Sequence, residues 1–170
     1  MNKLNFIFLI FCTYCLQCYA GIPNVMEKDE YYMEIAIQLA QQNPKVPFGS
    51  VIVDNETGKI LGTGVNAMHV NPTFHGEIVA MHDCISQHPH IDWSKVTLYT
   101  TAEPCPMCQS AIIWAGIPKV LFATSIAYLK QHGWHQIDIT AAEMNSKAPF
   151  YKGTLTGGVL AEKANVLYNR

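Results

Sequence analysis

The stretch T-A-E-P-C-P-M-C-Q-S-A, residues 101–111, decides the fold of this chain. It joins a β-rich run, V-T-L-Y-T at 96–100, to an apolar helical run that extends from Pro106 to Trp114. A buried strand that leads directly into a helix indicates one unit of a sheet covered by helices. The same junction carries two cysteines, so it also bears on the chemistry.

Cys105 and Cys108 are three residues apart at the start of the predicted helix. Side chains with that spacing face the same way, and the positive end of a helix favours thiolates, the form of cysteine that binds metals. A second motif, P-T-F-H-G-E-I-V-A-M-H at 72–82, places His75 just before a predicted helix, 76–87. Two thiolates and one imidazole make a three-ligand zinc set, and three ligands leave a position open for water, as in catalytic zinc sites.

Glu77 stands two residues after His75, where it would lie beside a metal-activated water molecule. A carboxylate in that place can take a proton and pass it on. Alone, a C-x-x-C in an exported protein is more often a disulfide or a redox pair, and an H-x-E triplet occurs by chance. Together, H-x-E and P-C-x-x-C form the pattern of zinc deaminases.

The rest of the chain alternates helix and strand without a repeat or linker. A helix is expected over 29–42, with Asp29 as a candidate N-cap, followed by a β-hairpin over 48–65 with its turn at 55–58. The order β-α-β-α-β predicts one domain, with the last strands parallel and the helices as crossovers. Its later elements are a strand over 119–124, helices over 127–132 and 140–146, a strand near 153–160 and a short helix over 161–168.

Residues 1–20 carry one lysine, then an apolar run, then the small residue Ala20, which is the layout of a secretory signal peptide. We therefore expect a secreted or periplasmic protein whose mature domain is 21–170. The run is short for a membrane span, so no span is expected after cleavage, although a retained N-terminal anchor is the alternative. Cleavage would remove three cysteines and leave three, an odd number that does not suggest a disulfide framework.

The charge of the predicted mature chain disfavours a polyanionic partner. Without Lys3, ten basic residues face thirteen acidic ones, a formal net charge of −3. The basic residues are scattered, whereas proteins that grip many phosphates gather them on one surface. A nucleic-acid substrate is therefore not expected, and a small molecule is favoured.

These motifs resemble the cytidine deaminase-like superfamily, from about Asp29 to the end of the chain. The form P-C-P-M-C, followed by S-A-I-I-W-A-G-I, is similar to the branch of guanine deaminases, tRNA-specific adenosine deaminases and small nucleoside deaminases. The resemblance implies an α/β fold of three α/β/α layers around a five-stranded mixed sheet, and a homodimer. It also implies Zn²⁺ on His75, Cys105 and Cys108, with Glu77 as the proton shuttle.

The resemblance also implies contacts with the substrate. Asn66 matches an amide that binds the base or ribose, the alternative being a turn asparagine. The backbone of Gly76 would contact the base. Phe48 matches an aromatic residue near the pocket and Trp114 a tryptophan of the base pocket in guanine deaminases, although each could instead belong to the core.

Substrate choice rests on weaker signals. Guanine deaminases carry an acidic residue after a Gly-aromatic pair, and Gly133-Trp134 here is followed by a shifted carboxylate, Asp138. We expect hydrolytic deamination of a nucleobase or nucleoside, with a purine such as guanine or adenosine favoured. The alternatives are deamination of adenosine or cytidine in tRNA or another nucleic acid, and a secreted zinc-binding module of the same fold without turnover.

Overall fold

The structure, a computed structural model, describes residues 25–170, so the expected leader at 1–20 lies outside the described residues. Five strands form one mixed sheet in the order β2-β1-β3-β4-β5. The strands are β1 (Gly49–Asp54), β2 (Ile60–Val65), β3 (Val96–Ala102), β4 (Lys119–Thr124) and β5 (Thr154–Gly157). The helices are α1 (Val25–Ala40), α2 (Gly76–Gln87), α3 (Pro106–Ala115), α4 (Ile126–Gln131), α5 (Ala141–Ser146) and α6 (Ala161–Asn165), with short 3₁₀ turns at Trp93–Lys95 and Val166–Tyr168.

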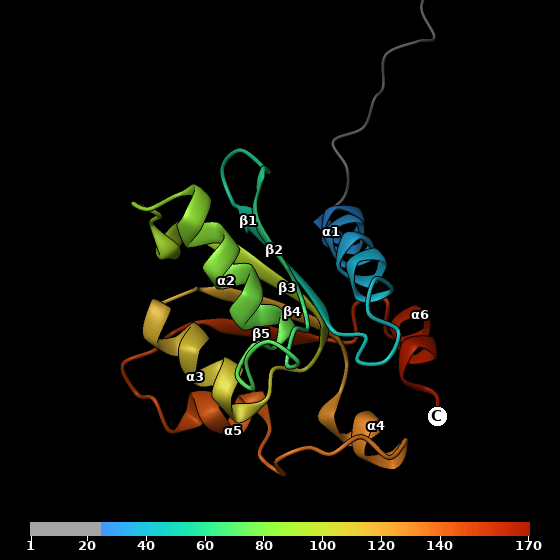
Figure 1. The fold of residues 1–170 in the computed structure, drawn as a ribbon. Coiled ribbons are helices and arrows are strands. Elements are labelled where there is room, and N and C mark those ends of the chain that lie inside the picture. The colour runs from blue at the N-terminus through green and yellow to red at the C-terminus, as the bar shows by residue number, and fades with distance from the viewer. Residues whose placement is uncertain (1–24) are drawn as a thin grey trace, which may run out of the picture.

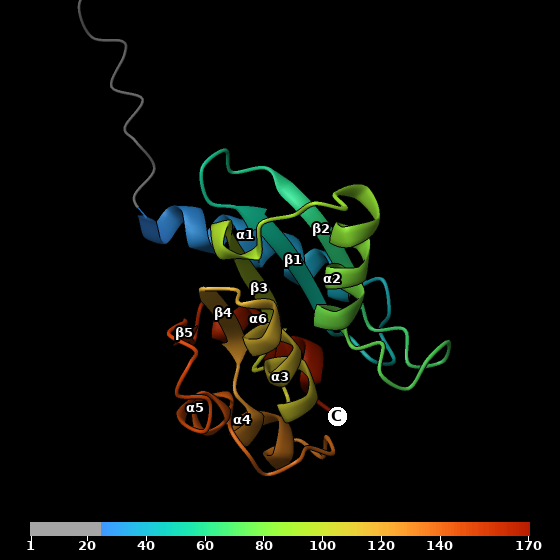
Figure 2. The same cartoon turned by 90° about the vertical axis from the view of Figure 1, so that its left-hand side faces the viewer.

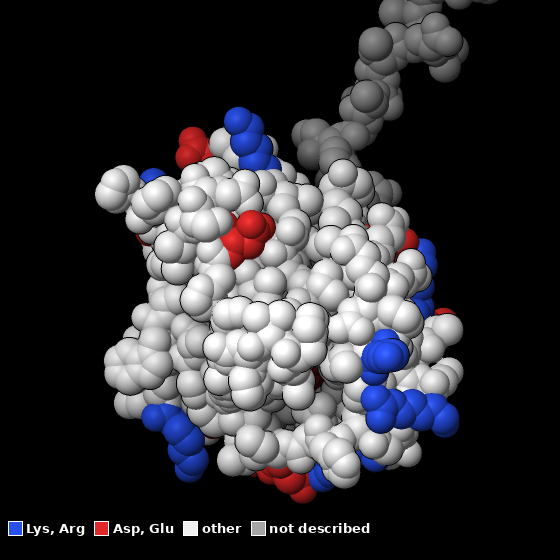
Figure 3. All heavy atoms as spheres, in the orientation of Figure 1, with Lys and Arg blue, Asp and Glu red and all other residues white. Residues whose placement is uncertain are grey.

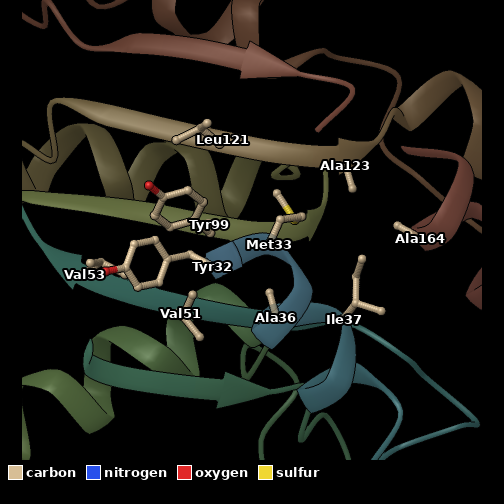
Figure 4. Close-up of a cluster of buried hydrophobic side chains, with 10 residues drawn as sticks. All are labelled: Tyr32, Met33, Ala36, Ile37, Val51, Val53, Tyr99, Leu121, Ala123 and Ala164. Atoms are coloured by element: carbon tan, nitrogen blue, oxygen red, sulfur yellow. The ribbon is translucent and has the colours of Figure 1, made fainter. Parts of the chain in front are cut away.

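The sheet lies between two helical layers, with α1 and α6 on one face and α2 and α3 on the other (Figures 1 and 2). Because successive side chains of a strand point to opposite faces, each central strand supplies both cores. Val51, Tyr99 and Leu121 pack against α1 in one cluster (Figure 4). Ile52 and Leu98, one position along their strands, pack against α2 and α3 on the other face.

Glycines let α2 lie directly against β2. A Cβ atom added at Gly64 would lie 2.0 Å from the carbonyl oxygen of Gly76 and 2.4 Å from the amide nitrogen of Ala80. Only a residue without a Cβ leaves room for this approach. The contact fixes the first turn of α2, and therefore the place of His75, relative to the sheet.

The predicted three-layer α/β/α fold with a five-stranded mixed sheet is confirmed. β1 pairs antiparallel with β2, as a hairpin requires, and β3, β4 and β5 run parallel as predicted from the helical crossovers. The prediction of Asp29 as an N-cap is wrong, because α1 already begins at Val25. Instead, the Asp29 carboxylate accepts a hydrogen bond from the Tyr99 hydroxyl at 2.6 Å and pairs with Lys119 at 3.0 Å. None of the described helices is both long enough and apolar enough to cross a membrane.

Candidate metal centre and substrate cavity

Two of the predicted zinc ligands occupy matching positions at the starts of two helices. His75 is the N-cap residue of α2 and Cys105 is the N-cap residue of α3, both with extended backbone. Their carbonyl oxygens accept the first helical hydrogen bonds, but neither side chain caps its helix. The imidazole and the thiol are therefore free to face each other. Cys108, one turn into α3, turns its thiol toward the same point and is fully buried.

The donor atoms of these three residues fit a tetrahedral zinc ion. All three lie within 4.8 Å of one another, and Nδ1 of His75 is 3.5 Å from Sγ of Cys105. Tetrahedral zinc with ordinary Zn–S and Zn–N bond lengths separates a sulfur from a nitrogen by about 3.6 Å. Two soft sulfurs and one imidazole are the donor types that zinc prefers, so both the geometry and the chemistry of the set fit the metal.

By itself, the protein stabilises only one of the two thiolates that a zinc ion would need. A hydrogen bond from Cys108, reinforced by His75, lowers the pKa of the Cys105 thiol to about 4. The same hydrogen bond and burial raise the pKa of Cys108, so the protein by itself favours only one thiolate. A divalent cation between the sulfurs would stabilise both, and metal binding would release the second proton.

Glu77 stands in the first turn of α2, and its side chain is only 6% exposed. Burial raises the pKa of its carboxyl, and the negative charge of Cys105 adds to the effect. A carboxyl with a raised pKa gives up and takes back a proton more readily near neutral pH than an exposed one. The position of Glu77 beside the three ligands therefore suits proton transfer.

A cavity of about 290 Å³ opens beside the ligands. Glu77, His75 and Cys105 all line it, and most of its lining surface is apolar. The residues lining it are Val46, Phe48, Asn66, Met68, His75, Glu77, Ala102, Glu103, Cys105, Leu129, Trp134, His135, Gln136 and Arg170.

Two predicted substrate contacts, Asn66 and Phe48, line this cavity. The Asn66 side-chain oxygen accepts the Met68 amide at 3.2 Å, which leaves its NH₂ group as the part able to donate to a ligand. Phe48 meets the Trp134 ring edge-on, with the ring centroids 5.2 Å apart. Gly76 is buried at the first position of α2, where an added Cβ would lie 3.0 Å from the Phe48 carbonyl oxygen.

The other three predicted contacts, Gly76, Trp114 and Asp138, are not among the residues that line the cavity. Trp114 is 79% exposed near the end of α3, because α3 turns its Cys108 and Ile112 side inward and Trp114 outward, and its ring contacts that of Phe150 with the centroids 5.3 Å apart. Asp138 is 81% exposed in its side chain and pairs with Lys130 at 2.6 Å. The geometry of this cavity does not support the assignment of Trp114 and Asp138 to the base pocket, which stays a prediction.

Trp134 and Arg170 were not predicted as site residues, yet both line the cavity. The Arg170 guanidinium lies 3.3 Å above the centroid of the Trp134 ring. The Trp134 indole also donates to the backbone carbonyl of Tyr168 at 2.9 Å. An available signal was that Arg170 is the single arginine of the chain, and that Trp134 follows a glycine in a polar loop.

Known proteins share this motif and fold. Residues 26–124 match the family described as the cytidine and deoxycytidylate deaminase zinc-binding region. A tRNA-specific adenosine deaminase of Streptococcus pyogenes is 30% identical over 152 residues, covering 86% of this chain and 91% of the relative. A probable cytosine deaminase of Schizosaccharomyces pombe is 37% identical over 105 residues, covering 60% of this chain and 64% of the relative.

Solved structures of guanine deaminases have the same fold. The enzyme of Nitrosomonas europaea superposes with a TM-score of 0.71 at 20% identity, covering 89% of this chain and 94% of that one. The enzyme of Bacillus subtilis gives a TM-score of 0.58 at 31% identity, covering 63% of this chain and 71% of that one. With the family matched over more than half of its length, this chain belongs to the zinc-dependent deaminases of the cytidine and deoxycytidylate deaminase family.

Proposed function

We propose that the protein hydrolytically deaminates a free purine base or purine nucleoside, such as guanine or adenosine. The observation that carries this proposal is the placement of Glu77, which is buried beside three metal-binding side chains and lines a small, mainly apolar cavity. A cavity of about 290 Å³ is at the lower end of the range for small-molecule sites. The flat Phe48 and Trp134 rings suit a planar heterocycle.

Each residue then has a defined part in the reaction. His75, Cys105 and Cys108 would hold zinc, which supplies an activated water molecule and stabilises developing negative charge. Glu77 takes one proton from the water molecule and delivers it to the ring nitrogen as the C–O bond forms. It then takes the proton of the new hydroxyl group and delivers it to the amine, so that the C–N bond breaks and the products are a carbonyl and ammonia. The free NH₂ group of Asn66 donates a hydrogen bond that orients the substrate.

Deamination of tRNA is the second candidate, because close relatives include tRNA-specific adenosine deaminases. The charge of the visible surface argues against an RNA substrate. The face shown in Figure 3 is largely uncharged, and its basic side chains do not form a continuous stripe. Proteins that bind folded RNA depend on contacts of lysine and arginine with phosphates.

Ammonia release from a panel of substrates tests the proposal and ranks the candidates. The panel holds guanine, guanosine, adenine, adenosine, cytosine and cytidine, together with an RNA stem-loop that presents adenosine in its loop. The proposal expects turnover of at least one free purine compound at a higher kcat/KM than the stem-loop. Turnover confined to the stem-loop or to the pyrimidines would contradict it.

We also propose that the protein is exported after removal of residues 1–20, on the strength of the lysine, apolar run and small residue at Ala20. The mass of the exported protein decides this point. A mass that corresponds to a chain beginning near residue 21 supports export by cleavage, and exported protein that still begins at Met1 contradicts it.

A further inference from the structure

Glu103 joins two helices to the metal-bearing end of β3. It directly follows β3, two residues before Cys105, and is 8% exposed. One of its carboxylate oxygens accepts the backbone N–H of Ile126, the first residue of α4, at 2.9 Å. The other accepts the backbone N–H of Ala141, the first residue of α5, at 3.0 Å. A single side chain thus binds two segments that are far from it in sequence.

The segment between these two attachment points forms one wall of the cavity. Leu129, Trp134, His135 and Gln136 line the cavity, and all lie between residues 126 and 141. The part from 132 to 140 belongs to no helix or strand, so regular backbone hydrogen bonding does not fix its position. Its distance from the metal ligands therefore depends on how its two ends are held, together with the contacts of Trp134 with Tyr168 and Arg170. We call residues 126–141 the substrate wall.

We propose that Glu103 is a positioning residue that sets the substrate wall at the correct distance from the metal centre and thereby determines substrate affinity. Hydrogen bonds to an ionised carboxylate are stronger than those between neutral groups, and here they act in a buried place. Both bonds end on backbone atoms at helix starts, so they hold the main chain and not only a side chain. This inference rests on the proposed function, because one of the two experiments that test it measures substrate affinity.

If Glu103 had only a structural role, it would act as an ordinary helix cap. Two other residues cap the same helices, and their variants serve as controls for the loss of a cap alone. Glu143 forms a capping box with Thr140 at the start of α5, with distances of 2.7 and 3.1 Å. Ser125 caps α4 by accepting the Tyr128 amide at 3.1 Å. Glu143→Ala and Ser125→Ala therefore weaken the same two helix starts without breaking their connection to β3.

The test compares Glu103→Gln with these two controls. The amide keeps one acceptor oxygen but turns an NH₂ group toward a backbone N–H, so one of the two connections is lost while the size of the side chain is kept. We expect KM for the best substrate to rise about 10- to 100-fold, the size of effect expected when one hydrogen bond to a charged group is lost. Zinc content should stay at the wild-type level and kcat should change by less than about threefold, since the wall binds the ground and transition states alike.

Hydrogen exchange measured by mass spectrometry gives a second readout that needs no substrate. Peptides covering 126–141 should exchange faster in Glu103→Gln than in wild type and in both controls, while peptides from β3 and α2 should not change. The inference is overturned if KM stays within about twofold of wild type, or if exchange of the wall is no faster than in the controls. If the wild-type protein turns over no member of the panel, the proposed function fails, and hydrogen exchange alone then supports or overturns the positioning role.

Discussion

The metal centre and the substrate wall are neighbours built in different ways. His75, Cys105 and Cys108 stand in the first turns of α2 and α3, two helices that pack on the central strands. The substrate wall joins α4 to an irregular segment at 132–140, and it is held by the packing of Leu129 and Trp134 near Tyr168 together with the Glu103 carboxylate, the bond from Trp134 to Tyr168 and the stacking of Arg170. On the proposed function, the two packed helices hold the groups that carry out the reaction. The substrate wall, a separate segment, contributes contacts that select the substrate.

Loss of a metal ligand should have the largest effect. Cys105→Ser or Cys108→Ser should reduce zinc from close to one ion per chain to a small fraction, abolish measurable deamination and lower the melting temperature, because the metal joins two helix starts. Elemental analysis and thermal unfolding measure these changes. Cys84→Ala, which alters a buried cysteine of α2 outside the ligand set, should keep the zinc. Full zinc content in both ligand variants would show that these thiols do not hold the metal.

A change in the packing under the metal centre should have an intermediate effect. Gly64→Ala introduces a methyl group where the backbone of α2 leaves no space, and overpacking of this kind costs about 1–3 kcal/mol of unfolding free energy. Because α2 carries His75 and Glu77, activity should fall as well. Urea unfolding measures the change. An unfolding free energy within about 0.5 kcal/mol of wild type would contradict the close contact of β2 and α2.

Substitutions of residues that do not line the cavity should have the smallest effects on activity. Trp114→Ala and Asp138→Ala remove exposed side chains, so kcat/KM should stay within about twofold of wild type, a change under roughly 0.4 kcal/mol. Trp134→Ala, the matched change at a residue that lines the cavity, should raise KM clearly more than either. Equal effects of Trp114→Ala and Trp134→Ala on KM would show that Trp114 also belongs to the substrate site.

The sequence predicts the two regions unequally, for physical reasons. The hairpin, α2, α3 and the three metal-binding residues depend on local spacing and on strand-to-helix order, which can be seen within short windows. The Gly133-Trp134 pair is visible in the sequence, but the contacts that place Trp134 at the cavity are with Tyr168 and Arg170, more than thirty positions along the chain, so the local pattern does not reveal its role. Trp114 and Asp138 were assigned by resemblance, which does not specify the outward turn of α3 or the pairing of Asp138 with Lys130.

The central claim is that Glu77 transfers protons beside a zinc ion, and Glu77→Gln tests it most directly. The amide is nearly the same size and still forms hydrogen bonds, but it cannot accept a proton from water. We predict an unchanged zinc content, a nearly unchanged unfolding free energy and a kcat reduced at or beyond the upper end of the roughly 10²- to 10⁴-fold range for loss of a general acid–base group. A variant that keeps its zinc and deaminates the best substrate within about threefold of wild type, a difference under roughly 0.7 kcal/mol, would contradict the assigned mechanism.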